Sequence, residues 1–255
     1  MQTLYKFDKP FIGATVVARP SQHNKSPYLL DCRLDDGSEA IVHNPALKCN
    51  GLVDPGARVW LQPAISDKSL SKYVLYLVDV GGTLVCIHPT VANEVCLGLI
   101  RCGKVATFIE RLQKEVVFGD CRFDFKGILN GKDTYIEVKS ASMADTVNCL
   151  PRDRARAEHG PLMAIFPYGN RPKEGLVSER ALKHVEGLKA AVAAGHLGYL
   201  VYISMRPDVC GLKVSELDPI YRQAVFGATG VRVEAFSVRW SLDGACHYEK
   251  RLPVT

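Results

Sequence analysis

Two acidic side chains and a lysine fall in neighbouring strand-like runs of one short segment, "FDFKGILNGKDTYIEVKSAS" (residues 123–142). Asp124 lies in the first run, and Glu137 and Lys139 lie in the second. Asn130-Gly131 between the runs predicts a hairpin with a two-residue type I′ turn, because such a turn needs positive φ at both positions. Opposed carboxylates with a nearby lysine are a candidate for metal-assisted chemistry.

The predicted turn fixes which side chains share a face. Asp124 lies directly opposite Glu137, and Arg122 lies opposite Lys139 on the same face, because strand side chains alternate with period two. A four-residue loop would keep these faces and place Asp124 opposite Lys139, whereas a three-residue loop would break the arrangement. The other face is apolar and is expected to be buried, with Phe123, Phe125, Ile136 and Val138.

Two directly opposed carboxylates destabilise a strand pair by about 0.2–1 kcal/mol when exposed, and a cation between them reverses the sign. Two interpretations follow. In the first, Lys139 bridges Asp124 and Glu137 in an ordinary surface ion-pair network. In the second, the carboxylates hold Mg²⁺, which prefers hard oxygen ligands. The metal would then polarise a phosphoryl oxygen and activate water, while Lys139 would orient that water or offset developing charge.

The elements that would position these residues change in type along the chain. Residues 11–88 hold short β-rich runs separated by turn signals, which predicts five or six strands in a small barrel or sandwich. After His88 the pattern alternates between helices and strands, which is an α/β order, so a domain boundary is expected near residues 86–90. The expected helices are 89–100, 105–116, 178–195 and about 219–228, and the expected strands are 115–118, 122–129, 134–141, 198–205 and 231–240.

Composition sets broad limits. The chain has 255 residues, 47% of them hydrophobic and 23% charged, which is enough for one large or two ordinary globular domains. A net charge of +5 and a pI of about 8.7 are compatible with nucleic-acid binding. The nine cysteines form no Cys-x-x-Cys pair, which argues against a zinc knuckle. Without an 18-residue apolar run or an apolar signal segment, we expect an intracellular protein, cytoplasmic or in an organellar matrix, with no membrane contact.

Asp124 followed by Glu137-Val138-Lys139 resembles the D…(D/E)xK signature of the PD-(D/E)xK nuclease superfamily. The surrounding chain is similar over nearly its whole length to the bacterial sugar fermentation stimulation protein A family. The matching stretches, in order, are "FIGATVV", "PGARVWL", "CIHPTVAN", "KEVVFGDCRFDFKGI", "TYIEVKSAS", "FP", "VSERALKHVEGL", "GYLVYISM" and "KRLPVT".

This resemblance implies two domains, an all-β OB-like barrel over residues 1–88 followed by an α/β PD-(D/E)xK nuclease-like domain over residues 89–255. It implies DNA binding without sequence preference, DNA being favoured over RNA, and Mg²⁺ or Mn²⁺ as cofactor. The implied metal site is Asp124, Glu137 and Val138, and the implied catalytic residues add Lys139. Glu115 matches the acidic position before the first strand. Glu94 competes with it for the role of additional acid, and Asn93 beside Glu94 also matches the family.

Basic and polar positions form the expected nucleic-acid contacts. Glu179, Arg180, Lys183 and His184 match a family helix, although an exposed polar face explains them equally well. The loop "CLPRDRARAEHG" (149–160) either touches phosphates or is an ordinary solvated loop. The expected contacts outside the helix are Arg122, Arg152, Arg154 and Arg156.

The chain departs from the family in two segments. Phe166-Pro167 is followed by Tyr168 where the family usually has Asp, and a longer loop comes after it. The family's Asn-Thr-Gly is replaced by Ala46, Leu47 and Lys48. If these segments contact substrate, specificity or activity has changed.

We therefore predict a nucleic-acid-binding protein with a Mg²⁺-dependent phosphodiesterase site. The first alternative is a non-catalytic DNA-binding or regulatory protein of the same family that retains an idle nuclease core. The second is a module that binds a small molecule or sugar phosphate. The oligomeric state is not predicted.

Overall fold

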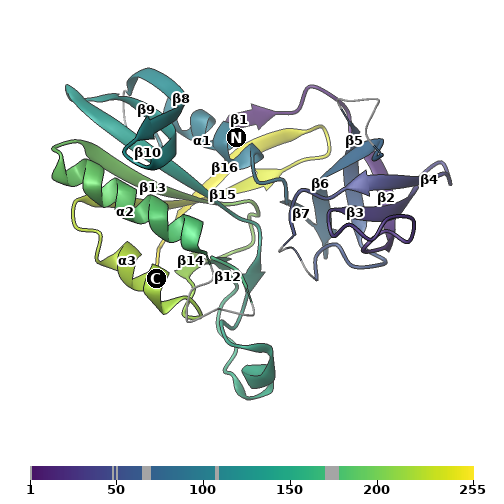
Figure 1. Ribbon diagram of the computed structural model, residues 1–255. Coiled ribbons are helices and arrows are strands. Elements are labelled where there is room, and N and C mark those ends of the chain that lie inside the picture. The colour runs from purple at the N-terminus through teal and green to yellow at the C-terminus, as the bar shows by residue number, and fades with distance from the viewer. Residues whose placement is uncertain (1, 48, 50, 65–69, 107–108, 170–177) are drawn as a thin grey trace.

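The computed structural model of the protein describes residues 2–47, 49, 51–64, 70–106, 109–169 and 178–255. They form a small barrel and a larger α/β unit that lie side by side (Figure 1). The chain begins with a strand of the α/β unit, passes through the barrel and returns to the α/β unit at helix α1.

Five strands close the barrel in the order β2-β3-β4-β6-β5, and β7 extends the sheet beyond β6. Neighbours are antiparallel except β4 and β6, whose parallel pairing of Val42 with Tyr73 closes the barrel. The expected small barrel of short strands is confirmed. Its strands are β2 Ile12–Ala18, β3 Leu29–Leu34, β4 Glu39–His43, β5 Arg58–Pro63, β6 Tyr73–Val80 and β7 Thr83–Cys86.

The α/β unit is built on a seven-stranded mixed sheet in the order β1-β16-β15-β13-β10-β9-β8. The three central strands β10, β13 and β15 are parallel, and the outer pairs are antiparallel. The bounds are β1 Thr3–Lys6, β8 Glu110–Phe118, β9 Cys121–Leu129, β10 Lys132–Ala141, β13 Leu197–Ser204, β15 Val231–Trp240 and β16 Ala245–Leu252. A small second sheet and a 3-10 helix complete the unit, with β11 Ala144–Asp145, β12 Met163–Phe166, β14 Gly211–Val214 and η1 Pro151–Arg156.

Helices cover both faces of the large sheet. Helix α1 (Val91–Arg101) packs on one face with Ile136 and Val138, which we call the α1-side core. Helices α2 (Glu179–Ala193) and α3 (Pro219–Phe226) pack on the other with Tyr135 and Leu200, which we call the α2-side core. Among the described residues, no helix has the length and apolar character needed to cross a membrane.

Helix α2 forms as its sequence predicts. Ser178 is the N-cap, and its Oγ accepts a hydrogen bond of 3.3 Å from the backbone amide of Ala181. Gly195 follows the last turn with a φ of 89°, a conformation that glycine adopts without strain. Val185 and Leu188 face the sheet and are fully buried, so the helix is fixed at both ends and along one face.

The predicted hairpin of β9 and β10 is confirmed in its register. Leu129 pairs with Lys132 across Asn130 and Gly131, whose φ angles are 53° and 76°. The ladder continues to the pair of Phe125 with Ile136 and ends there. Asp124 and Glu137 are the next residues along each strand.

Beyond that point β9 changes faces, so the prediction of a single apolar face is wrong for Phe123. All four predicted core residues are buried. Phe125, Ile136 and Val138 pack in the α1-side core, whereas Phe123 packs in the α2-side core. Regular alternation would put Phe123 and Phe125 on one face, so the strand twists through Asp124.

The neighbouring strand β8 changes faces at the same level. Leu112 packs against the α1-side core and Val116 against the α2-side core, and Glu115 between them has a φ of 57°. Positive φ is uncommon at a non-glycine residue, and the register of β8 with β9 continues through Glu115 without a shift. The curl of β8 and β9 away from the rest of the sheet is visible in Figure 1.

The helix expected over residues 105–116 is wrong where the structure describes it, because strand β8 begins at Glu110. Thr107 and Phe108 of that expected helix lie outside the described residues. The segment is the edge strand of the sheet, and its pairing with β9 outweighs a local pattern that also suits a helix.

The expected first domain of residues 1–88 differs at its start. Strand β1 pairs with β16 in the large sheet rather than with the barrel. Phe7, just after β1, contacts the rings of Tyr76 from the barrel and Trp240 from β15, at centroid distances of 5.0 and 5.7 Å. The barrel and the α/β unit therefore share part of the α1-side core.

Candidate active site

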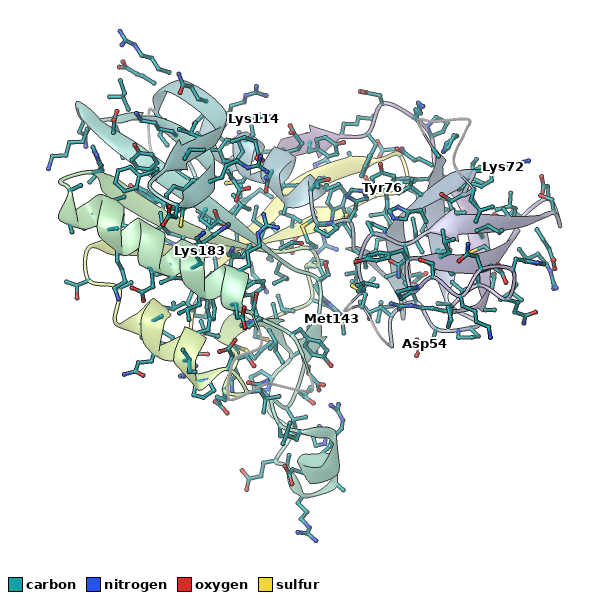
Figure 2. All side chains as sticks on the ribbon, in the orientation of Figure 1. Asp54, Lys72, Tyr76, Lys114, Met143 and Lys183 are labelled. Atoms are coloured by element: carbon teal, nitrogen blue, oxygen red, sulfur yellow. The ribbon has the colours of Figure 1, made fainter. Side chains whose placement is uncertain are left out.

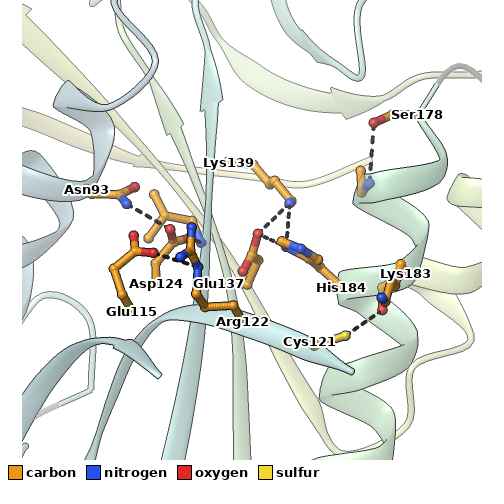
Figure 3. Close-up of polar contacts among 12 residues, drawn as sticks. Asn93, Glu115, Cys121, Arg122, Asp124, Glu137, Lys139, Ser178, Lys183 and His184 are labelled. Atoms are coloured by element: carbon orange, nitrogen blue, oxygen red, sulfur yellow. Dashed lines mark hydrogen bonds and ion pairs between the residues drawn. The ribbon is translucent and has the colours of Figure 1, made fainter. Parts of the chain in front are cut away.

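Asp124 lies where β9 crosses between faces, and its carboxylate joins two other elements (Figure 3). Oδ1 accepts a hydrogen bond of 2.7 Å from Nδ2 of Asn93 on α1, and Oδ2 accepts one of 2.7 Å from the backbone amide of Val138 on β10. Burial, and then the nearby charge of Glu137, raise the pKa of Asp124 to about 6. The carboxyl group can therefore gain or lose a proton near neutral pH.

Glu137 lies on the central strand β10 with only 3% of its surface exposed. Its Oε1 accepts a hydrogen bond of 2.6 Å from Nζ of Lys139 and contacts Nδ1 of His184. Burial by itself would raise the pKa of Glu137, but hydrogen bonds and charge from His184 and Lys139 outweigh it and hold the pKa below its usual value. Glu137 is therefore ionised at neutral pH.

The second oxygen of Glu137, Oε2, is buried and has no hydrogen-bond partner among the described residues. An unpartnered buried acceptor costs about 1–3 kcal/mol, and more when it carries charge. Native structures rarely leave such an atom unless a water, an ion or a substrate group meets it. Oε2 is thus the position of this site where a bound cation would be stabilised most.

His184 reaches this cluster from helix α2. Its Nδ1 is 3.4 Å from Nζ of Lys139, and its side chain is buried with that of Lys139. The contact with Glu137 requires a proton on Nδ1. The sequence-based interpretation of His184 as a nucleic-acid contact did not anticipate this position. Helical spacing could have indicated it, because His184 lies on the same stripe as Ala181 and Leu188.

The two candidates for an additional acid are both partly exposed and paired with cations. Glu115 bonds Arg122, with Nε 2.9 Å from Oε2, and the flanking pairs Lys114–Phe125 and Val116–Phe123 place Glu115 level with Asp124 (Figure 3). Glu94 bonds Nζ of Lys114 at 2.5 Å. Glu115 is therefore beside Asp124, but within the described residues its contacts go to Arg122.

The other predicted nucleic-acid contacts do not join the cluster. Arg154 makes two hydrogen bonds of 2.5 and 2.8 Å to Asp145, and η1, which carries it, projects away from the large sheet in Figure 1. Arg156 is exposed on the same element, and the side chain of Arg152 lies outside the described residues. On α2, the side chains of Glu179, Arg180 and Lys183 are exposed.

The residues around Glu137 fit a divalent cation of the Mg²⁺ class. Asp124 and Glu137 provide two carboxylates near the backbone of Val138. The carbonyl of Val138 is an oxygen ligand of the type that such ions bind. No group of three or more His, Cys, Asp or Glu side chains that could hold a metal occurs in the described part of the chain. A site with two carboxylates suits Mg²⁺, which keeps several waters, better than Zn²⁺.

The chain is similar to known proteins over most of its length. A family model described as the sugar fermentation stimulation protein RE domain matches residues 163–244. Sugar fermentation stimulation protein homologs of Ruegeria sp. and Thioalkalivibrio sulfidiphilus are each 30% identical, covering 85% and 92% of this chain and 85% and 91% of their own. The structure of Pyrococcus furiosus SfsA in complex with Ca²⁺ superposes over all of both chains with a TM-score of 0.77 at 17% identity, which shows a common fold.

Proposed function

Because the chain belongs to the sugar fermentation stimulation protein family, we propose that it binds nucleic acid and hydrolyses phosphodiester bonds with a divalent cation at Asp124 and Glu137. The observation that carries the proposal is Oε2 of Glu137, which is buried and has no hydrogen-bond partner among the described residues, in a side chain whose other oxygen binds the buried Lys139.

Asp124, Glu137 and the carbonyl of Val138 would hold Mg²⁺, with Mn²⁺ as a substitute. The Ca²⁺ complex of the Pyrococcus furiosus protein supports a site for a hard cation, since Ca²⁺ and Mg²⁺ both take oxygen ligands. When bound, the cation would supply Lewis acidity toward a phosphoryl oxygen and a water of lowered pKa.

Lys139 has the position of a group that acts on the phosphate. Its ammonium is 2.6 Å from Oε1 of Glu137, and two further N–H bonds remain to be directed at the attacking water or a phosphoryl oxygen. Removing one such preorganised donor typically lowers the rate about 10²–10³-fold.

His184 is a positioning residue in this proposal. It holds Oε1 from the side of α2, as Lys139 does from β10, and both leave Oε2 for the cation. Asn93 holds Oδ1 of Asp124 from the side of α1, while Oδ2 accepts from the amide of Val138.

The barrel supports the nucleic-acid part of the proposal. Its closure in the order β2-β3-β4-β6-β5, with only β4 and β6 parallel, supports an OB-type barrel, a fold whose face and loops suit oligonucleotides. We propose that DNA binds there and across the α/β unit without sequence preference, as the resemblance to the family implies.

One observation favours the non-catalytic alternative. Both oxygens of Asp124 already accept hydrogen bonds, and the negative charge of Glu137 is balanced by its contacts with Lys139 and His184. The cluster is therefore stabilised by the chain's own groups without a cation. In that case the protein binds DNA and the cluster only stabilises the fold.

A cleavage assay separates the two functions. Labelled single- and double-stranded DNA and RNA are incubated with the protein and Mg²⁺, Mn²⁺ or a chelator. We expect cleavage with either metal and none with the chelator. If no substrate is cut with either metal while DNA is still bound, the catalytic proposal is wrong and the binding function replaces it.

A further inference from the structure

A cavity of about 260 Å³ lies where the barrel meets the α/β unit. We call it the junction pocket. The barrel contributes Ala46 and Leu47, and the α/β unit contributes Met143 and Phe166. Figure 2 shows Met143 between the two parts of the molecule. The walls are therefore mostly apolar and come from segments far apart in the sequence.

Four hydroxyl groups lie among these apolar walls, from Ser140, Ser142, Tyr168 and Ser178. That of Ser142 already donates a hydrogen bond of 2.7 Å to the carbonyl of Cys86. Ser178 uses its Oγ as an acceptor for the amide of Ala181 and keeps a proton to donate. The side-chain hydroxyls of Ser140 and Tyr168 have no hydrogen-bond partner within the described residues. A mostly apolar cavity with a few polar groups is the usual form of a small-ligand site.

The junction pocket adjoins the candidate active site. Ser140 follows Lys139 directly on β10, where each residue advances the strand by about 3.3 Å. Ser178 precedes His184 by six residues, which is about 9 Å along α2 at 1.5 Å per residue. Figure 3 shows Ser178, Lys139 and His184 together. The strand that carries Lys139 and the helix that carries His184 therefore both reach the wall of the pocket.

The size and chemistry of the pocket select a single ring system. At about 260 Å³ the cavity is smaller than most sites for drug-sized ligands. Phe166 and Tyr168 offer aromatic surface, on which any base can stack, and the hydroxyls offer partners for the base edge. A base accordingly fits both the apolar walls and the hydroxyls.

We propose that the junction pocket receives one nucleobase, that of the nucleotide next to the phosphate held at Glu137 and Lys139. This inference rests on the proposed function and adds the substrate group that the enzyme recognises beside the scissile bond. Binding of a single unstacked base makes a single strand or a frayed end the preferred substrate, because a base inside a duplex is not accessible.

The test compares ligands with and without a base. Ligand-observed NMR measures binding of thymidine 5′-monophosphate and of 2-deoxyribose 5-phosphate. Fluorescence anisotropy measures binding of a short single-stranded DNA and of versions with one abasic position each. Stacking of one base is worth about 1–3 kcal/mol, so one abasic position should weaken binding by roughly 5- to 150-fold. The nucleotide should likewise bind more tightly than the sugar phosphate.

Two variants change the pocket in opposite ways. Ala46→Trp fills it, and Tyr168→Ala removes an aromatic wall. Each should reduce the difference between ligands with and without the base. Tyr28→Ala is the control, because Tyr28 is an exposed tyrosine of the barrel that does not line the pocket, and it should keep the full difference.

The inference is overturned if wild-type protein binds the nucleotide and the sugar phosphate equally, or if Ala46→Trp and Tyr168→Ala keep the wild-type difference. If the protein cleaves DNA but an abasic position has no effect on binding, the proposed base binding in the junction pocket is wrong while the proposed phosphodiesterase function stands. If the protein binds the nucleotide more tightly than the sugar phosphate but cleaves no substrate, base binding in the pocket is supported and the phosphodiesterase function is wrong.

Discussion

The carboxylate of Glu137 is held unequally at its two oxygens. Lys139 and His184 both contact Oε1, while Oε2 lies buried without a partner among the described residues. Asp124 adds a second carboxylate whose pKa is raised to about 6 by burial and by Glu137. Both features destabilise the metal-free folded protein. A cation would remove both penalties, and the free energy recovered would add to its binding affinity.

The raised pKa of Asp124 gives a pH-dependent prediction for Asp124→Asn. Between the unfolded pKa of 3.8 and the folded value of about 6, the folded protein binds more protons than the unfolded chain, so this carboxyl lowers stability as pH rises through that window. Asn carries no charge and can still accept from Val138. With chelator present, the melting temperature of Asp124→Asn should exceed that of wild type at pH 7.5, and the excess should shrink at pH 4.5.

Thermal unfolding at the two pH values checks this. Asp120→Asn is the control, since Asp120 is an exposed carboxylate in the turn before β9. Mg²⁺ should raise the melting temperature of wild type but not of Asp124→Asn. An excess that is the same at both pH values would show that Asp124 is not the titrating group.

At the scale of elements, the distance between α2 and β9 determines where His184 lies. Gly187 allows the close approach, because a Cβ at this position would lie 2.5 Å from Sγ of Cys121 and 3.1 Å from Cζ of Phe123. In a free helix, Ala in place of Gly would stabilise by about 1 kcal/mol. In the folded protein, the contact with β9 determines whether Ala at this position stabilises or destabilises the fold.

Gly187→Ala should therefore lower the melting temperature and slow cleavage, because α2 must shift and take His184 away from Glu137. Cys121→Ala added to Gly187→Ala removes the nearest atom and should restore part of both. Thermal unfolding and cleavage rates of the single and double variants test this. A more stable Gly187→Ala protein would show that the helix has room to spare.

How well the elements can be predicted from sequence depends on how local their causes are. The β9–β10 hairpin is predicted because Asn130 and Gly131 specify the turn by themselves. The change of faces at Glu115 and Asp124 is not predicted. The positive φ of a non-glycine residue such as Glu115 has no signal in the sequence, because it arises from the curl of the sheet. The contact of Asn93 with Asp124 joins α1 to β9 across 31 residues and exists only once both elements pack.

At the scale of the whole molecule, the barrel and the α/β unit share a core around Phe7, with Tyr76 and Trp240 as its neighbours. Strand β1 escapes sequence-based domain assignment, because its partner β16 lies at the other end of the chain. Strand β1 belongs to the large sheet, and the chain continues from it directly into the barrel, so β1 links the α/β unit to the barrel. Nucleic acid bound across both parts, as we propose, would contact two parts that are joined by this shared core.

Salt dependence tests whether that surface binds phosphates. The chain carries a net charge of +5, and each phosphate neutralised by Lys or Arg releases counterions. The logarithm of the association constant should fall linearly with the logarithm of salt concentration, by about 0.9 per phosphate on duplex DNA and about 0.7 on single strands. Anisotropy titrations with unrelated sequences should give similar constants. Affinity that hardly changes from low to moderate salt would argue against nucleic acid as the partner.

The central claim is that Lys139 and the two carboxylates form a phosphodiesterase site, and single-turnover cleavage by Lys139→Met tests it most directly. Met keeps the buried stem and removes the ammonium, and Lys189→Met is the control because Lys189 lies on α2 and pairs only with Glu186 of the same helix among the described residues. We predict that Lys139→Met cleaves about 10²–10³-fold more slowly than wild type with saturating Mg²⁺, while Lys189→Met stays close to wild type. Cleavage by Lys139→Met at the wild-type rate would contradict the account.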